Sequence, residues 1–478
     1  MTVMKKWDGS CTVFLVLGAL FFLWQGAAWQ GVANTPALAA FAGTGQVIYY
    51  LAGLVGLLLG GLLVDKAHIA HTWRRLTAML AGVAAVCTVA VRFSPNLPVL
   101  AVLLVVGGLC GFAALSPLLY RVFRHIPFEL KPVVMGLAMG LGLLLRLPSD
   151  YQLAFGWDAD WFYSISAVVA MAALAVLVLL WKPRARRVAA ELSPADKRHW
   201  PGLLLLGGIC AVLLLVLPVI WNSSFATVYF TNAQQFALSV VRAVSPLLAG
   251  LLSIKFGRNT TLFLGVAVMG IGLVSYFFPH SGAWGVGFSI AGAIGGALFL
   301  VPLVVMFTDI AHYARGPGVT GVLGFALAAL MQLLGLPLSA LMRFAGEDIA
   351  FIIYLVVYFV ALPLATIFFV QLQRFKEEHE EDALDGEGLP EQTTPAKTAD
   401  LRRYALTPQE ETILPYAIGP MDIKEIATML QLTPEGAKAQ VRAILDKTQT
   451  PSRRALRLLL VGDERDAPAE DDAPEDNA

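Results

Sequence analysis

Twelve apolar runs, each long enough or nearly long enough to cross a lipid bilayer as a helix, dominate the sequence. A spanning helix needs about 20 apolar residues, because the hydrocarbon core is about 30 Å thick and a helix rises about 1.5 Å per residue. At 57% hydrophobic and 14% charged residues, the chain is too apolar for a soluble protein of 478 residues. It is therefore expected to be an all-α, polytopic membrane bundle. The predicted spanning ranges are 11–33, 42–64, 75–93, 97–118, 132–147, 161–181, 201–221, 236–254, 260–278, 283–307, 318–342 and 349–371.

Lys and Arg residues are distributed very unevenly between the two sets of loops. One set carries most of them, including the pairs Lys5–Lys6, Arg74–Arg75 and Arg186–Arg187. The other set has only Arg92, Arg146 and Arg343, all close to predicted helix ends. Loops rich in Lys and Arg stay in the cytoplasm. The imbalance predicts a multi-pass protein of a bacterial inner membrane with both termini cytoplasmic.

An internal repeat divides the apolar runs into two halves, near residues 1–181 and 201–375. The second run ends in Gly61-Leu62-Leu63-Val64-Asp65-Lys66, and the eighth ends in Gly250-Leu251-Leu252-Ser253-Ile254-Lys255-Phe256-Gly257-Arg258. In each copy a glycine permits a close helix approach, and a basic turn follows at the membrane surface. The basic segment from Lys182 to Trp200 separates the halves.

These two loops resemble the signature G-x-x-x-D-[RK]-x-G-[RK] of the major facilitator superfamily, a likeness that extends over residues 1–375. Asp65 and Lys66 match in the first copy, where the segment 67–71 replaces the glycine turn. In the second copy Ile254 replaces the acid. The resemblance implies a central cavity that opens when one half rocks on the other. It also implies gating-loop roles for Gly61, Asp65, Lys66, Gly250, Lys255, Gly257 and Arg258.

In that family Asp65 would help to lock the cytoplasmic side. The alternative is an ordinary interfacial carboxylate beside Lys66. The sequence does not decide between these two interpretations.

A few polar residues at membrane depth are candidates for a ligand cavity, because polar groups are costly in lipid. Arg242 lies about two turns into the predicted eighth helix, where it either binds an anion or extends to the outer surface. Arg146 is expected to be an interfacial anchor, and Asp309 is expected to face cytoplasmic solvent. The candidate residues for an unknown small-molecule ligand are Gln25, Trp29, Asn222, Arg242 and Gln332.

The segment 401–462 has the pattern of a small helical domain. Thr407 with Glu410 and Asp422 with Glu425 have the spacing of capping boxes at two helix starts. Thr433-Pro434-Glu435 begins a third helix, whose apolar positions recur at helical spacing. Two short helices separated by about three residues are typical of a helix-turn-helix, whose second helix can enter a DNA major groove.

This segment resembles a LuxR/GerE-type helix-turn-helix, most clearly in Lys424-Glu425-Ile426-Ala427. It departs from the family at Gly436-Ala437-Lys438, where Thr-Val-Lys is usual. The resemblance implies binding to double-stranded DNA, with a homodimer formed through this domain. The alternative is a small bundle with solvated charges that does not bind DNA. The candidate DNA-binding residues are Lys424, Thr433, Glu435, Lys438, Gln440, Arg442, Lys447 and Arg453.

The remaining segments and the cysteines carry no recognisable functional motif. Residues 376–400 form an acidic, turn-rich stretch expected to be a flexible linker, and the acidic tail 463–478 is expected to be disordered. The four cysteines lie inside apolar runs, with spacing that suggests neither a metal site nor disulfides. No nucleophile elbow, phosphate loop or metal-ligand cluster is recognisable in the sequence, so we expect no enzyme activity, catalytic residue, metal or cofactor.

Two functions follow from these features. The favoured hypothesis is a membrane-embedded, one-component transcriptional regulator, in which a transporter-like body senses a small ligand and the helix-turn-helix binds DNA. The alternative is a secondary transporter of the major facilitator superfamily whose C-terminal helix-turn-helix is degenerate. DNA affinity of the C-terminal domain distinguishes the two.

Overall fold

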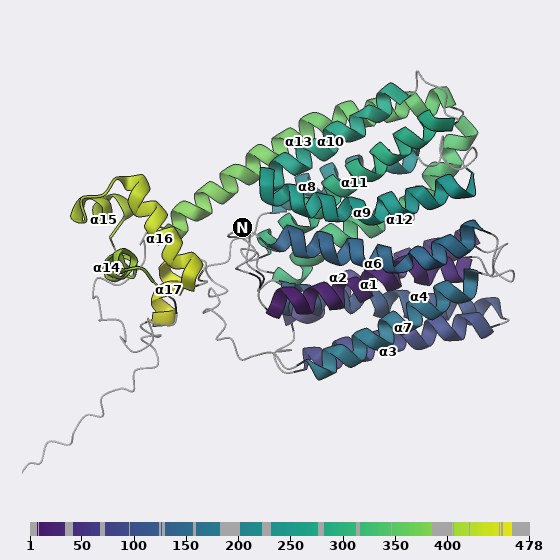
Figure 1. Ribbon diagram of the computed structural model, residues 1–478, viewed down its shortest axis with the longest axis horizontal. Helices are drawn as coiled ribbons and strands as arrows, with labels where there is room; N and C mark the ends of the chain where they lie inside the picture. The colour runs from purple at the N-terminus through teal and green to yellow at the C-terminus, as the bar shows by residue number, and fades with distance from the viewer. Residues whose placement is uncertain are drawn as a thin grey trace, which may run out of the picture. The chain divides into compact units, whose positions relative to one another are not determined.

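A computed structural model of the chain is helical throughout its described part, with no strand in those residues (Figure 1). The described residues are 7, 9–33, 42–66, 72–94, 96–123, 126, 130–155, 159–181, 201–221, 231–275, 282–311, 316–345, 347–384, 404, 406–419, 421–448, 450 and 453–460. They divide into two compact units. The membrane unit contains α1 to α12 and α13 as far as Phe369, and the C-terminal unit contains the rest of α13 and α14 to α17.

The membrane unit consists of two groups of helices that follow each other along the chain. The first half contains α1 (Gly9–Ala33), α2 (Ala42–Lys66), α3 (Trp73–Phe93), α4 (Leu97–Ala113), α5 (Leu115–Arg121), α6 (Lys131–Ala154) and α7 (Ala159–Leu180). The second half contains α8 (Pro201–Trp221), α9 (Asn232–Phe256), α10 (Arg258–Ser275), α11 (Gly282–Ile310), α12 (Pro317–Ala345) and α13 (Glu347–Leu384).

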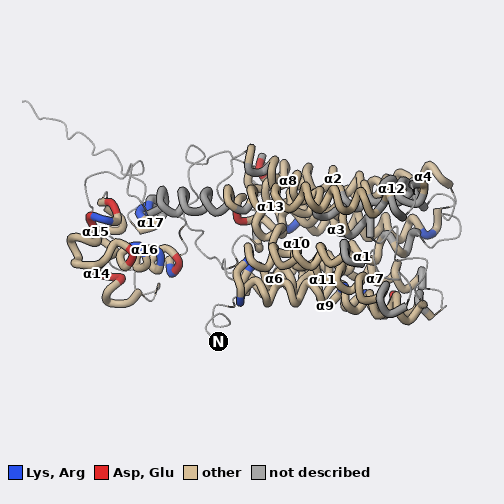
Figure 2. The backbone as a smooth tube through the Cα atoms, turned by 90° about the horizontal axis from the view of Figure 1, so that it is seen from above, with Lys and Arg blue, Asp and Glu red and all other residues tan. Residues whose placement is uncertain are grey.

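Length and apolarity support a membrane-spanning role for these helices. Among the described residues, 9 helices are long and apolar enough to cross a bilayer, and Arg258–Ile271 and Pro317–Leu330 are shorter apolar helices. A helix lies at each of the twelve predicted ranges. The chain is thus a multi-pass membrane protein, and its total of twelve spans stays a prediction. Figure 2 shows how few charged residues lie along the described parts of these helices.

Two helix boundaries differ from the sequence prediction. The fifth span was expected to end at residue 147, before Pro148, but α6 continues through this proline to Ala154. Proline is tolerated inside spanning helices because neighbouring helices satisfy the freed backbone groups. The last apolar run was expected to end at residue 371, with a turn or two more of helix in the Glu run that follows; α13 continues to Leu384 and so includes the start of the predicted linker.

The halves pack against each other along two long helix pairs. In Figure 1 the purple and blue helices of the first half lie together, and so do the teal and green helices of the second half. Helix α6 packs along α9, and α2 packs along α12, so each half contributes one helix to each pair. Any movement of one half on the other must occur at these two pairs.

The C-terminal unit is a small bundle of α14 (Pro408–Ala417), α15 (Ile423–Met429), α16 (Pro434–Thr448) and α17 (Arg453–Leu460). Its own apolar core includes Leu414, Ile426, Val441, Ile444 and Leu456. The predicted capping boxes are present at the starts of α14 and α15. Ser452, expected to cap α17, lies outside the described residues.

Candidate functional site

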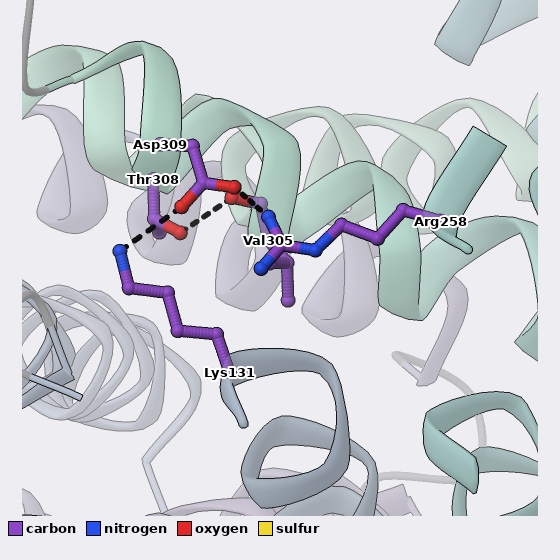
Figure 3. Close-up of polar contacts among 5 residues, drawn as sticks. All are labelled: Lys131, Arg258, Val305, Thr308 and Asp309. Atoms are coloured by element: carbon purple, nitrogen blue, oxygen red, sulfur yellow. Dashed lines mark hydrogen bonds and ion pairs between the residues drawn. The ribbon is translucent and has the colours of Figure 1, made fainter. Parts of the chain in front are cut away.

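A buried group of three charges joins the halves at one end of the membrane unit (Figure 3). This end, at which α2, α9 and α11 finish and α6, α10 and α12 begin, is called the Asp309 end. Lys131 Nζ at the start of α6 donates to Asp309 Oδ1 over 3.0 Å, and Arg258 Nη1 pairs with Asp309 Oδ2. Lys131, Arg258 and Asp309 are only 2%, 8% and 6% exposed. The expectation that Asp309 faces solvent is therefore wrong. Asp309 is buried, because the other half supplies Lys131 as a partner.

Asp65 makes a second link between the halves at the same end. Its carboxylate accepts hydrogen bonds from the backbone nitrogens of Gly318, at 2.6 Å, and Val319, at 3.0 Å. Both nitrogens lie in the first turn of α12, where backbone N–H groups lack helical partners and the helix dipole favours an anion. Asp65 is therefore more than an interfacial carboxylate, since it caps a helix of the opposite half.

The two repeated glycines lie at close approaches between helices of opposite halves. A side chain placed on Gly61 would bring its Cβ within 2.9 Å of Val319 Cα, and one on Gly250 within 2.8 Å of the Pro132 carbonyl oxygen. Real Cβ atoms almost never come so close to backbone. The repeat thus marks equivalent points on the two long pairs, α2 with α12 and α9 with α6.

The second copy of the loop compensates for its missing acid through another helix. Gly257 has φ of 82°, a conformation that glycine adopts without a steric penalty, and it directly precedes Arg258 at the start of α10. The acid that pairs with Arg258 is Asp309 of α11. Lys255 lies over the Phe256 ring, 5.2 Å from its centre. Lys66 ends α2, and its side chain is outside the described residues.

The other region of interest is a polar network between α1, α6 and α7. Arg146 pairs with Asp150 one turn later on α6, at 3.1 Å, and donates to the Gly26 carbonyl oxygen of α1 at 3.2 Å. The Tyr163 hydroxyl on α7 donates to the other oxygen of Asp150 at 2.5 Å. Arg146 lies eight residues before the end of α6, about 12 Å from it. It is therefore not the interfacial anchor that the sequence suggested, because α6 continues beyond Pro148.

Arg242 of α9 lies near this network from the opposite half. It is ten residues inside α9, about 15 Å from the helix start. It interacts electrostatically with both Arg146 and Asp150. Its side chain remains exposed, although protein surrounds it on most sides. The anion-binding interpretation of Arg242 and its extension to the outer surface both stay predictions.

The other predicted cavity residues are only partly described. Gln25 is half-buried on α1 and adjoins Gly26, whose carbonyl binds Arg146. Trp29 and Gln332 lie in α1 and α12, but their side chains are outside the described residues, as is all of Asn222. The structure thus brings Arg242 near two residues that the sequence did not assign to the cavity, Arg146 and Asp150.

A separate apolar pocket of about 370 Å³ lies within the second half. Helices α8, α11 and α12 line it, through residues such as Ile209, Phe307 and Leu327. Its wall is almost entirely apolar. It has no polar group that could orient a substrate.

Three of the predicted DNA-binding residues, Arg453, Lys447 and Thr433, have structural roles in the C-terminal unit. Arg453 is 1% exposed, and its guanidinium donates to the carbonyl oxygens of Tyr416, Ala417, Gly419 and Met421. It holds the end of α14 and the next turn in place, so we do not retain it as a DNA contact. Lys447 donates to the Glu410 carboxylate, which also accepts from the Thr407 nitrogen.

Burial alone would raise the pKa of Glu410, but hydrogen bonds from Lys447 and Thr407 outweigh it, and the pKa lies below its usual value.

Thr433 caps α16 by accepting from the Gly436 nitrogen at 3.1 Å. The remaining candidates lie at least partly at the surface of α15 and α16, and their contact with DNA stays a prediction. They are Lys424, Glu435, Lys438, Gln440 and Arg442.

Known structures resemble the membrane unit in fold. No protein-family model and no curated protein matches the sequence. A bacterial homologue of the iron transporter ferroportin, in an outward-facing state, is 13% identical over 77% of this chain and 100% of its own, with a TM-score of 0.53. A D-xylose-proton symporter is 16% identical over 74% of this chain and 96% of its own, with a TM-score of 0.53.

The major facilitator superfamily proton:xylose symporter XylE bound to 6-bromo-6-deoxy-D-glucose is 15% identical over 76% of this chain and 95% of its own, with a TM-score of 0.52. At these identities the likeness concerns the fold alone. The membrane unit has a fold like that of major facilitator superfamily transporters.

Proposed function

We propose that the chain is a secondary transporter of the major facilitator type, which exposes a central site to each side of the membrane in turn. The observation that carries this proposal is the pair of links between the halves at the Asp309 end. In one link Asp65 of α2 accepts hydrogen bonds from the start of α12. In the other link Asp309 pairs with both Lys131 and Arg258. Such links close one end of the bundle. They consist of polar contacts that water can replace, so this end is able to open.

We further propose that the Asp309 end faces the cytoplasm of a bacterium and that both termini are cytoplasmic. The excess of Lys and Arg in the loops on this side supports the orientation. The conformation described here would then be closed to the cytoplasm. The fold neighbours support transport as the function, since the relatives of known activity in the comparison are transporters.

Alternating access is tested by distance measurements on the purified chain in lipid nanodiscs. Spin labels at Leu63 of α2 and Phe256 of α9, two exposed positions at the Asp309 end, belong to opposite halves. We expect two populations of label distance whose proportions change with pH or added small molecules. A second pair, at Phe155, the residue directly after α6, and at Phe236 of α9, should move in the opposite sense. A single fixed distance for both pairs under all conditions would refute a transporter.

Transport itself is measured as uptake into vesicles across a panel of small molecules, with empty vesicles as the control. The panel has to be broad, because neither the substrate nor the direction of transport follows from the fold. Uptake of at least one compound, lost in a variant that cannot change conformation, is the supporting result.

A second candidate function, a membrane-bound transcriptional regulator, is favoured by one observation. The C-terminal unit has its own core, and α15 and α16 are joined by four residues, Leu430 to Thr433. Gln431 in this turn has φ of 55°, so the chain reverses sharply between the two helices. The surface residues Lys438 and Arg442 of α16 would then contact phosphates.

Binding of the full-length chain in nanodiscs to a fluorescent DNA library at low salt tests this candidate, because low salt strengthens phosphate contacts most. The double variant K438A/R442A should lose binding, while Q409A, an exposed change on α14, should keep it. No binding by the unaltered chain at low salt would remove the regulator from consideration. A homodimer through this unit would show as two chains per DNA site.

A further inference from the structure

We propose that the cavity between the halves binds a small organic anion, whose carboxylate is held by Arg242 of α9 together with Arg146 of α6. The inference rests on the proposed transport function and names its substrate class.

The charge balance in this region is positive. Asp150 is the acidic partner of Arg146, and its second oxygen is occupied by the Tyr163 hydroxyl. Both carboxylate oxygens of Asp150 therefore have partners, one on α6 and the other on α7. Arg242 feels the fields of both Arg146 and Asp150, but it makes no hydrogen bond or ion pair with them. Two cations and one anion leave a net charge of about +1 at this level of the bundle.

Arg242 has no hydrogen bond or ion pair to another residue that the structure describes, and an arginine in such a position is costly at this depth. Arg242 and Arg146 lie about 15 Å and about 12 Å from their respective helix ends, which is close to the middle of a bilayer core of about 30 Å. Charged groups in this position usually mark a substrate or ion pathway. Because the Arg242 side chain is accessible within the protein, a ligand can reach it.

Guanidinium chemistry selects the ligand class. The planar group presents parallel N–H donors that match the two oxygens of a carboxylate. One uncompensated charge suits a monoanion. The surroundings also offer an aromatic and an amide group, because Tyr50 of α2 interacts electrostatically with Arg146 and Gln25 lies beside the Gly26 carbonyl that Arg146 binds. A compact monocarboxylate with a polar or aromatic remainder fits these contacts.

The two arginines belong to opposite halves, which gives the site its significance for transport. Helix α6 carries Arg146 and is part of the first half, and α9 carries Arg242 and is part of the second. An anion that contacts both bridges the halves at their longest shared helix pair. Binding would then favour whichever arrangement of the halves brings the two guanidinium groups closest together.

The experiment compares three carboxylates with their uncharged amides. Acetate, benzoate and nicotinate, and acetamide, benzamide and nicotinamide, are titrated into the purified full-length chain in detergent, and binding is measured by thermal shift and by calorimetry. We expect at least one carboxylate to bind and its amide not to bind. In R242Q the affinity should fall about 10- to 100-fold, as for loss of a charge-assisted hydrogen bond.

Two further variants separate a binding role from a structural one. R242K retains the charge but loses the parallel N–H donors, so it should bind more tightly than R242Q and more weakly than the unaltered chain. R92Q removes an arginine that lies over the Trp161 ring on another part of the first half, and it should bind like the unaltered chain. If R242Q does not fold, R146K serves as the second variant. It should lose carboxylate binding while its melting temperature without ligand equals that of the unaltered chain.

The proposal is overturned if none of the carboxylates binds, if the amides bind equally well, or if R242Q binds as the unaltered chain does. Stabilisation by inorganic phosphate alone would also overturn it. Because binding is measured without transport, the two proposals can fail separately. Carboxylate binding together with fixed spin-label distances would indicate that the chain is a receptor and not a transporter. Uptake of a neutral compound without carboxylate binding would indicate a transporter of another substrate class.

Discussion

Replacing Asp309 with Asn should open the end of the membrane unit at which this residue lies. The substitution keeps the size of the side chain and removes its charge. Lys131 and Arg258, both buried, then lose the carboxylate that they share. The closed arrangement loses its ion pairs, and two like charges remain enclosed. In the open arrangement the same groups are hydrated, so the substitution affects that state much less.

The size of the effect follows from the burial of the three groups. Removing one partner of a buried ion pair usually costs about 3–5 kcal/mol, because the other charge is left uncompensated. We take the lower value, about 3 kcal/mol, since water reaches this end of the bundle when it opens. Each 1.4 kcal/mol changes an equilibrium about tenfold. If the open form is about 1% of the unaltered chain, it becomes about half of D309N.

Spin labels at Leu63 and Phe256 report this change as a new, longer distance component. The matched control is Thr308→Val, since the Thr308 hydroxyl donates to the Val305 carbonyl oxygen of its own helix at 2.6 Å (Figure 3). Its distance distribution should equal that of the unaltered chain. A D309N distribution identical to both would show that the three charges do not hold the end closed, and the reasoning from burial would be wrong.

Three further predictions concern single residues. Asp65→Asn should shift the same label distances toward the open form, since charge-assisted hydrogen bonds contribute about 1.5–3 kcal/mol; an unchanged distribution would leave Asp65 as a mere interfacial carboxylate. Arg453→Met should destabilise the C-terminal unit by about 3–5 kcal/mol, seen as faster hydrogen exchange in α14 to α17 of the full chain, because four buried carbonyl groups lose their donor. The pKa of Glu410 is lower in the folded unit than the unfolded pKa of 4.5, so the ionised carboxylate stabilises the fold. This stabilisation is fully present above the unfolded pKa and is lost as the pH falls through the lower folded pKa. Unfolding of E410Q followed between pH 6 and about pH 3 should therefore vary less with pH than that of the unaltered unit.

Features that depend on local pattern could be predicted from the sequence. The capping boxes at Thr407 and Asp422 were identified from spacing alone, because they involve residues three positions apart. The repeated glycines were identified from the similarity of two segments, and both lie at close approaches between halves. The apolar runs located the helices, because a spanning segment must be apolar over nearly its full length.

Features that depend on how the halves dock could not be predicted. Lys131 and Asp309 are separated by 178 residues, and no periodicity connects them. Asp309 alone looked like a solvated helix end. Arg146 was placed at the surface because Pro148 suggested a helix end, and the continuation of α6 to Ala154 moved it into the bundle. Arg453 looked like a surface cation, since nothing in its neighbours reveals that four carbonyls of another segment converge on it.

The proposed anion site and the closed end are coupled if both proposals hold, and the coupling has a required size. A ligand shifts an equilibrium only through its difference in affinity for the two states. To open an end held closed by about 3 kcal/mol, a carboxylate must bind the open state about 100-fold more tightly than the closed one. Linkage is reciprocal, so D309N, in which the open state is already populated, should bind the same carboxylate about 25-fold more tightly than the unaltered chain. Equal affinities in D309N and T308V, together with an opened D309N, would show that the anion does not distinguish the states and that its binding does not drive the movement of the halves.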